Sequence, residues 1–289
     1  MIIGENRVAV IENVKNAANN GEFYTKVELN DPVLTREQSD EIVFGYLKNR
    51  KTAAFKFKSF LARHMANAAT AALNRETQIV GLQKAKGISG GAIITSNHFS
   101  PIENTGIRHI VRKLGKKRIN IVSQETNLAF PGIIGFLMNY ADIIPMSNNV
   151  HYMQRDFAPV IEELINKNEY VLIYPEQEMW FNYRKPRPPK RGAYYYAARM
   201  NVPIISCFIE MQEKPEMERK NFHKVRFVVH VLDVLYPDAA KSVKQNSEEM
   251  CKKDYELKKA VYERVYGKEL SYTFDKTDIA GWTGEDDEQ

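Results

Sequence analysis

Short runs of β-branched and aliphatic residues alternate with helical patterns over the middle of the chain. The runs begin near residues 92, 119, 141, 170, 202 and 225 and read AIITSN, INIVSQ, ADIIPM, YVLIYP, VPIISCFI and VRFVVHVLDVL. Helical patterns separate the first five runs, over about 108–113, 130–139, 156–167 and 192–200. This alternation predicts an α/β fold with a mostly parallel central sheet and helices on both faces. Functional residues are then expected beyond the carboxyl ends of the strands.

The residues before this pattern are predicted to be helical. One helix is expected from near Thr35 to Asn49, and a second from about Thr52 to Asn74. The second has an apolar face flanked by basic residues: Phe57, Phe60, Leu61, His64, Met65 and Ala68, with Lys56, Lys58 and Arg63 beside them. Such a face either packs against a core, which is the commoner case, or lies on an anionic lipid surface.

These patterns divide the chain into three regions. Residues 1–75 form an N-terminal helical region with a potential membrane-associating face, and residues 76–240 form the α/β core. Residues 241–289 hold a terminal helix over about 244–267 and an acidic tail made of Glu285, Asp286, Asp287 and Glu288.

The composition is that of a globular protein rather than a disordered or fibrous one. With 289 residues, folding can bury about three quarters of the surface of the unfolded chain, so disulfide or metal staples are unnecessary. The two cysteines, Cys207 and Cys251, cannot form a zinc cluster, and we expect an intracellular protein without a metal. The most apolar candidate segment, between Glu125 and Asp142, is too short to cross a bilayer, and the N-terminus lacks the apolar region of a signal peptide.

The charges are grouped, although their sum is small. The chain has 41 basic and 36 acidic residues, a formal charge of +5. One basic group precedes a predicted helix start at Gly192, where cations and a helix N-terminus together suit an anionic ligand; a solvated surface loop is the alternative. The two basic groups are Arg112, Lys113, Lys116, Lys117 and Arg118, and Arg184, Lys185, Arg187, Lys190 and Arg191.

The sharpest candidate for catalysis follows the first strand, in the sequence ITSNHFSPIEN. Ser100, Pro101 and Glu103 match the capping box of a helix that begins there. His98 has no comparable structural explanation. A histidine at the carboxyl end of a strand, one turn away from a carboxylate, can act as a general base that the carboxylate orients. We therefore predict His98 and Glu103 as a catalytic pair, with Asn97 beside them.

The strand YVLIYP also ends in a carboxylate, Glu176, after Tyr174 and Pro175. With these residues in place, the sequence resembles the phospholipid/glycerol acyltransferases, the family of 1-acylglycerol-3-phosphate acyltransferase. The matching elements, in family order over about residues 76–235, are Asn97-His98 with Glu103 in place of the usual aspartate, Tyr174-Pro175-Glu176, Lys190-Arg191-Gly192-Ala193 and Val202-Pro203-Ile204-Ile205.

The resemblance implies transfer of a fatty acyl group to a hydroxyl of a glycerolipid. The donor is a thioester, either acyl-CoA or acyl carrier protein, which serves as co-substrate, so no bound cofactor is expected. His98 is implied as the general base and Glu103 as its orienting partner. The implied location is cytoplasmic, at the periphery of the membrane, with a lyso-lipid acceptor. The substrate-binding residues implied by the matching motifs are Asn97, Glu176, Lys190, Arg191 and Gly192, and the basic pattern before the predicted helix start at Gly192 adds Arg184, Lys185 and Arg187 as candidates.

The sequence departs from the family where the family holds the acceptor's phosphate. Gln177, Glu178 and Met179 replace the glycine, threonine and arginine expected after Glu176, and the strand ADIIPMS lacks the arginine of the second motif. Losing two charge-assisted contacts weakens phosphate recognition. Either Arg184, Lys185 and Arg187 supply the charge, or the acceptor has no terminal phosphate; the sequence leaves both open.

Three other functions are compatible with parts of the sequence. An acyl-thioester hydrolase would use the same histidine. A nucleic-acid-binding module would use the basic groups and the tyrosines at 194–196, but +5 is a small charge for that purpose, and we expect no nucleic-acid partner. The residues Gly87 to Gly91 spell the G-x-S-x-G pattern of hydrolases, yet no strand precedes the serine as a nucleophile elbow requires.

Overall fold

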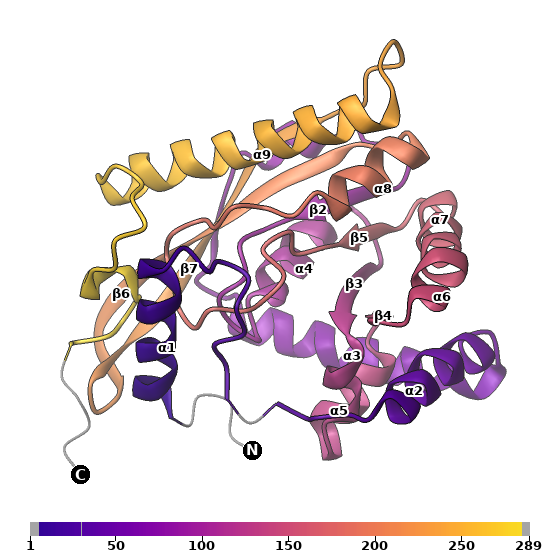
Figure 1. The fold of residues 1–289 in the computed structure, drawn as a ribbon, viewed down its shortest axis with the longest axis horizontal. Coiled ribbons are helices and arrows are strands. Elements are labelled where there is room, and N and C mark those ends of the chain that lie inside the picture. The colour runs from indigo at the N-terminus through magenta and orange to yellow at the C-terminus, as the bar shows by residue number, and fades with distance from the viewer. Residues whose placement is uncertain (1–5, 30, 285–289) are drawn as a thin grey trace.

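The structure is a computed structural model and describes residues 6–29 and 31–284. In that part of the chain, a seven-stranded sheet with the order β1-β7-β6-β2-β5-β3-β4 forms the centre (Figure 1). Only the pair β6 and β7 is antiparallel within this sheet. The strands are β1 Gln78–Val80, β2 Ala92–Thr95, β3 Ile119–Gln124, β4 Ile143–Met146, β5 Tyr170–Leu172, β6 Ile204–Arg219 and β7 Phe222–Leu235. The predicted α/β fold with a mostly parallel sheet is confirmed.

Two strands differ from the sequence prediction. The edge strand β1 was not predicted, because its three residues are too few to display a period. Strand β6 continues to Arg219, well beyond the apolar run, and forms a long hairpin with β7. Residues 212–215 of β6 alternate between half-buried and exposed, which is the pattern of a strand with a solvated face, and residues 216–219 are all exposed.

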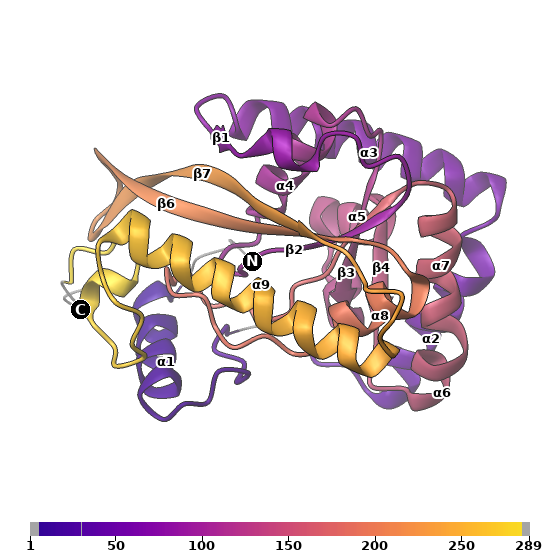
Figure 2. The ribbon, with the colours of Figure 1, turned by 90° about the horizontal axis from the view of Figure 1, so that it is seen from above.

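Helices cover both faces of the sheet (Figure 2). α4 packs on one face of the sheet, and α3 packs against the outer side of α4. α7, α8 and α9 pack on the other face of the sheet. The helices are α1 Arg7–Asn19, α2 Arg36–Asn49, α3 Ala53–Leu73, α4 Asn104–Lys113, α5 Gly132–Tyr140, α6 Val150–Tyr152, α7 Ala158–Asn166, α8 Gly192–Met200 and α9 Val243–Tyr266.

Strands β2 and β5 are buried along their whole length and almost entirely apolar, because both of their sides are covered. In β2, Ile94 belongs to the cluster under α4, whereas Ile93 belongs to the cluster under α7 and α8. Both side chains are fully buried. This double burial fixes the register of β2, and the chain leaves the sheet at Thr95 directly before the candidate residues.

The N-terminal helices form where predicted, with one correction. Thr35 and Gln38 form a capping box at the start of α2, and Thr52 caps α3. The apolar face of α3, however, does not pack against the core, because its Phe57 is 63% exposed and Phe60 51%. The buried positions of α3 are Ser59, Ala62 and Thr70. The core-packing interpretation of the Phe/Leu face is therefore wrong.

An additional helix, α1, was not predicted. Its Val10, Ile11 and Val14 pack with Trp180 and Ile279, among other residues, in a separate hydrophobic cluster. Trp180 also donates its indole N–H to the Thr25 carbonyl at 3.0 Å. The N-terminal segment therefore supports the loop that follows β5. The predicted acidic tail at 285–288 lies outside the described residues.

No helix in residues 6–29 and 31–284 combines the length and the apolar character that a membrane crossing requires.

Candidate active site

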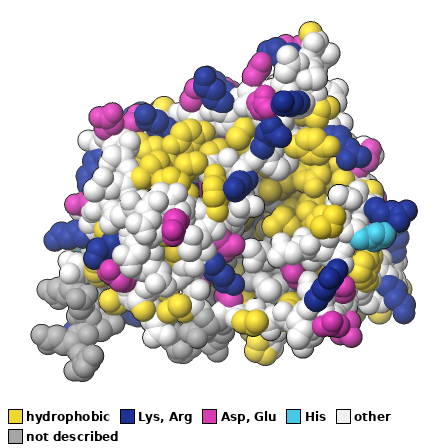
Figure 3. Space-filling model, in the orientation of Figure 1, with side chains coloured by type: hydrophobic (Ala, Val, Ile, Leu, Met, Phe, Trp, Pro, Cys, Tyr) yellow, Lys and Arg dark blue, Asp and Glu magenta, His cyan; other side chains and the backbone are white. Residues whose placement is uncertain are grey.

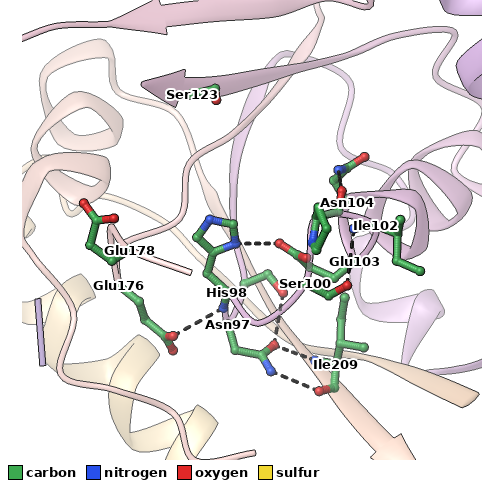
Figure 4. A network of polar contacts seen from close by, with 12 residues as sticks. Asn97, His98, Ser100, Ile102, Glu103, Asn104, Ser123, Glu176, Glu178 and Ile209 are labelled. Carbon is green, nitrogen blue, oxygen red and sulfur yellow. Dashed lines mark hydrogen bonds and ion pairs between the residues drawn. The ribbon is translucent and has the colours of Figure 1, made fainter. Parts of the chain in front are cut away.

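His98 and Glu103 form a hydrogen-bonded pair just beyond the carboxyl end of β2 (Figure 4). The distance from His98 Nδ1 to Glu103 Oε1 is 2.6 Å. The Glu103 side chain is 1% exposed and that of His98 is 20% exposed. In the tautomer with Nδ1–H, the imidazole donates to the carboxylate and keeps the lone pair of Nε2 for another proton. Nε2 makes no hydrogen bond to any residue that the structure describes, so it is available to a substrate.

This pairing overturns the predicted capping box. Residues 101–103 form a turn, and α4 begins only at Asn104, with Glu103 as a cap whose side chain makes no capping hydrogen bond. Ser100 instead accepts the Ile102 N–H on its Oγ and the Glu103 N–H on its carbonyl. Because the helix starts later than predicted, the Glu103 carboxylate is free to contact His98.

Tyr174 lies against the imidazole of His98. The two rings stack, with centroids 4.0 Å apart and planes inclined by 12°. Within the described part of the chain, the buried Tyr174 hydroxyl and the buried Glu103 Oε2 both lack a hydrogen-bond partner. Burial, and then the charge of Glu103, raise the pKa of Tyr174 well above its usual value, so its hydroxyl stays protonated. A protonated donor and a carboxylate oxygen with an unused lone pair thus lie beside the histidine.

Asn97 anchors the turn that presents His98. Its Nδ2 donates to the Ile209 carbonyl at 3.0 Å, and its Oδ1 accepts the Ile209 N–H at 2.8 Å. The side chain thereby continues the pairing of β2 with β6 past the end of the strand. This contact makes Asn97 a support of the turn, and its direct contact with a substrate stays a prediction.

Glu176 and Arg187 form a buried ion pair behind His98. Glu176 Oε2 accepts the backbone N–H of His98 at 3.3 Å and the Arg187 Nε–H at 3.2 Å. Arg187 is 1% exposed, and its guanidinium also donates to the carbonyls of Phe23, His98 and Glu178. Burial holds the pKa of Arg187 below its usual value, and the charge of Glu176 opposes that change. The pair therefore ties the loop after β5 to the turn at His98.

Comparison with known proteins gives the family. A family model described as Acyltransferase matches residues 73–210, the stretch that contains both carboxylate motifs and His98. Over this stretch, the chain matches the acyltransferase family. Among solved structures, it is similar to the 1-acyl-sn-glycerophosphate (LPA) acyltransferase PlsC from Thermotoga maritima, at 14% sequence identity and a TM-score of 0.48. That match covers 92% of this chain and 98% of the other. The predicted family and the prediction of an acyl-transferring enzyme are confirmed.

Gln177, in the turn after Glu176, has an uncommon backbone conformation. Gln177 stands where the family pattern has a glycine, and its φ is 66°. This left-handed conformation favours glycine, since it strains a residue with a Cβ atom. The turn after Glu176 therefore has a conformation that a glycine at position 177 would adopt without strain.

The five cations at 184–191 do not form the open cluster that the sequence suggested. Lys185 is 4% exposed and pairs with Asp278 at 2.6 Å, and Arg187 belongs to the pair with Glu176. Arg184 pairs with Glu213 and Arg191 with Glu248, while Lys190 lies over the ring of Tyr24. Gly192 starts α8 beside them. The prediction of an open cationic cluster failed because, apart from Glu176, the acidic partners come from β6 and the C-terminal region. These segments are distant in sequence, so a local charge pattern does not include them.

The face of the acyltransferase seen in Figure 3 is hollowed near its centre, over the β3 and β5 region of Figure 1, and hydrophobic side chains border the hollow. At this edge of the sheet, Gln124 at the end of β3 donates to Glu178 at 2.8 Å. The predicted position of functional residues beyond the carboxyl ends of the strands therefore fits the arrangement of His98, Gln124 and Glu176. Among the described residues, no group of three metal-ligating side chains could hold a metal ion.

Proposed function

We propose that this acyltransferase moves a fatty acyl group from a thioester, acyl-CoA or acyl carrier protein, to a hydroxyl of a glycerolipid. The observation that carries the proposal is the 2.6 Å hydrogen bond between His98 Nδ1 and Glu103, which leaves Nε2 available at the edge of the sheet. The family supports acyl transfer, and this geometry supports His98 as the base for it.

The chemistry follows from the protonation states of the pair. Nε2 of His98 takes the proton of the acceptor hydroxyl as the oxygen attacks the thioester carbonyl, and the C–O bond forms. Glu103 stabilises the imidazolium that results. The tetrahedral intermediate then collapses, the C–S bond breaks, and the imidazolium returns the proton to the leaving thiolate. A positioned base contributes about 10² to 10⁴ in rate.

For the acceptor, we propose a lyso- or glycolipid without a terminal phosphate monoester. The sequence left two alternatives for the missing phosphate-binding arginines, and the contacts at 184–191 favour one of them. Arg184, Lys185 and Arg187 each donate to carboxylates or backbone carbonyls of the chain itself. The pairs of Lys185 and Arg187 are buried, and breaking them to bind a phosphate would leave uncompensated charges, which is costly.

The exposed apolar face of α3 supports a membrane location. Phe57, Phe60, Leu61 and Met65 are each at least 41% exposed and lie at three- and four-residue steps on one side of the helix. A contiguous exposed apolar patch on a soluble fold marks an interaction surface. For an enzyme that acylates lipids, a peripheral contact with the lipid surface is the interaction that serves the reaction.

The test offers the purified enzyme a labelled acyl thioester with lysophosphatidic acid, other lysophospholipids and glycolipids in separate reactions. The proposal predicts acceptor-dependent labelled lipid, with lysophosphatidic acid among the poor acceptors. A clear preference for lysophosphatidic acid would overturn the acceptor assignment. Free fatty acid formed at the same rate with and without acceptor would instead identify a thioester hydrolase.

A further inference from the structure

A basic groove lies between the end of α3 and the outer side of α4. Its volume is about 510 Å³, which is within the range of ligand sites. α4 contributes positions three and four residues apart, which share one side of a helix. The lining residues are Ala71, Asn74, Arg75, Thr77, His109, Arg112 and Lys113.

The cations of this groove have no acidic partner in the described part of the chain. Arg75, Arg112 and Lys113 are exposed, and no ion pair joins any of them to a carboxylate of residues 6–29 or 31–284. Arg112 makes only a long hydrogen bond, 3.5 Å, to the Asn67 carbonyl. The pKa of His109 is lowered by burial and then by Lys113 and Arg112, as a positive local potential requires. The cations at 184–191, in contrast, contact carboxylates, backbone carbonyls or an aromatic ring.

The groove continues the exposed apolar face of α3. This face runs from Phe57 through Leu61, Met65 and Ala68 to Ala71, which lines the groove. Two of the three basic residues that flank the face in sequence are used elsewhere. Lys58 lies over the ring of Tyr140, and Arg63 forms a two-pronged ion pair with Asp142. Besides the exposed Lys56 near its start, the face thus has three cations at its end that form no ion pair with a described residue.

The groove is separate from the catalytic pair. It lies on the outer side of α4, whereas Ile107, Ile110 and Val111 on the inner side pack into the core. Asn74, which lines the groove, is itself bonded to Thr105 in the first turn of α4, at 2.9 Å. The helix thus stands between the groove and the interior in which Glu103 is buried, so these cations are not placed to hold the reacting hydroxyl or carbonyl.

We propose that Arg75, His109, Arg112 and Lys113 bind the phosphate of an anionic phospholipid while the apolar face of α3 contacts the acyl region of the same membrane. Charge complementarity and continuity with the apolar face both point to a lipid surface. The inference deepens the proposed membrane location, since it specifies the lipid charge that the enzyme selects. It does not depend on the role of His98.

The test measures binding of the full chain to pure phosphatidylglycerol and pure phosphatidylcholine vesicles by co-sedimentation. The variant Arg112→Ala/Lys113→Ala removes two groove cations. Its matched control, Lys252→Ala/Lys253→Ala, removes two exposed cations from α9 on the opposite face of the sheet. Far-ultraviolet circular dichroism verifies that both variants fold.

The wild-type protein is expected to prefer phosphatidylglycerol. The groove variant should bind these vesicles about 30-fold more weakly, since two cations at an anionic surface contribute about 2 kcal/mol. The control should change by less than about threefold, because its cations lie on the opposite face of the sheet from the proposed contact and salt screens their interaction with the lipid. Equal losses in both variants would overturn the proposal.

Two further arms separate the alternatives. A raised KM for acyl-CoA in the groove variant, with unchanged vesicle binding, would assign the groove to the phosphates of the donor and overturn the lipid assignment. His98→Ala should bind vesicles like the wild type. Wild-type binding to neither vesicle would overturn both the headgroup site and the membrane location, whereas loss of acyl transfer alone would concern only the proposed reaction.

Discussion

Tyr174 stacks on His98 with ring centroids 4.0 Å apart, and its buried hydroxyl lies beside the carboxylate that orients the same histidine. The ring of Tyr174 thus lies against the proposed base, and its hydroxyl lies beside the negatively charged carboxylate of Glu103. This relationship makes Tyr174 a positioning residue for the pair, a role that the aromatic-proline-glutamate pattern alone did not reveal.

Tyr174→Phe keeps the ring and removes the hydroxyl. We expect kcat to fall about threefold to tenfold, because the variant loses the polar hydroxyl beside the Glu103 carboxylate, and one such polar interaction contributes about 1 kcal/mol. Tyr174→Leu, which also removes the stack, should fall further. Steady-state kinetics with unfolding curves for both variants separate positioning from stability. A wild-type kcat in Tyr174→Phe would contradict a role for the hydroxyl. Equal kcat values in Tyr174→Phe and Tyr174→Leu would contradict a role for the ring.

Arg187 should be far more important for stability than its neighbour Arg191. Arg187→Ala leaves Glu176 as a buried unpaired charge, which costs about 3 to 5 kcal/mol of unfolding free energy. Arg191→Ala removes a pair whose members are both about half exposed, which costs about 0 to 1 kcal/mol. Urea denaturation of both variants measures the difference. Similar losses would mean that the buried pair does not hold the loop.

Glu28 should make the protein less stable as the pH rises. Burial, and then the charge of Asp31, raise the pKa of Glu28 to about 7. A folded-state pKa above the unfolded value means that ionisation opposes folding. The cost is absent below about pH 4 and complete above about pH 7, where it reaches up to about 3 kcal/mol.

Glu28→Gln removes this titration, so the variant should gain stability over the wild type at pH 8 and show no gain at pH 4. Unfolding free energies at the two pH values test this. A gain of equal size at both would contradict the titration of Glu28.

Gln177→Gly should stabilise the turn after Glu176. The exposed glutamine holds a left-handed φ of 66°, which costs a residue with a Cβ atom about 1 kcal/mol relative to glycine. The added freedom of glycine in the unfolded chain offsets part of this gain. Thermal unfolding measures the net effect, and a large destabilisation would show that the glutamine side chain makes a contact that the turn needs.

The sequence was informative where the interacting residues are close along the chain. His98 and Glu103 are five residues apart, so their pairing was predictable, whereas Glu176 with Arg187 joins two loops and required the fold. The capping box failed because Glu103 satisfied two local patterns, and the histidine contact prevailed. In α3, periodicity identified an apolar face and did not reveal whether that face points inward. The cations at 184–191 looked free because, apart from Glu176, their acidic partners lie in distant β6 and the C-terminal region.

The most direct test of the central claim compares acyl transfer by His98→Ala with that by the wild type, using a labelled acyl thioester and the best acceptor of the panel. His151→Ala, an exposed histidine on α6, serves as the matched control. We predict a fall in kcat of about 10² to 10⁴ for His98→Ala and none for the control. Undiminished acceptor-dependent transfer in a folded His98→Ala protein would contradict the assignment of His98 as the general base.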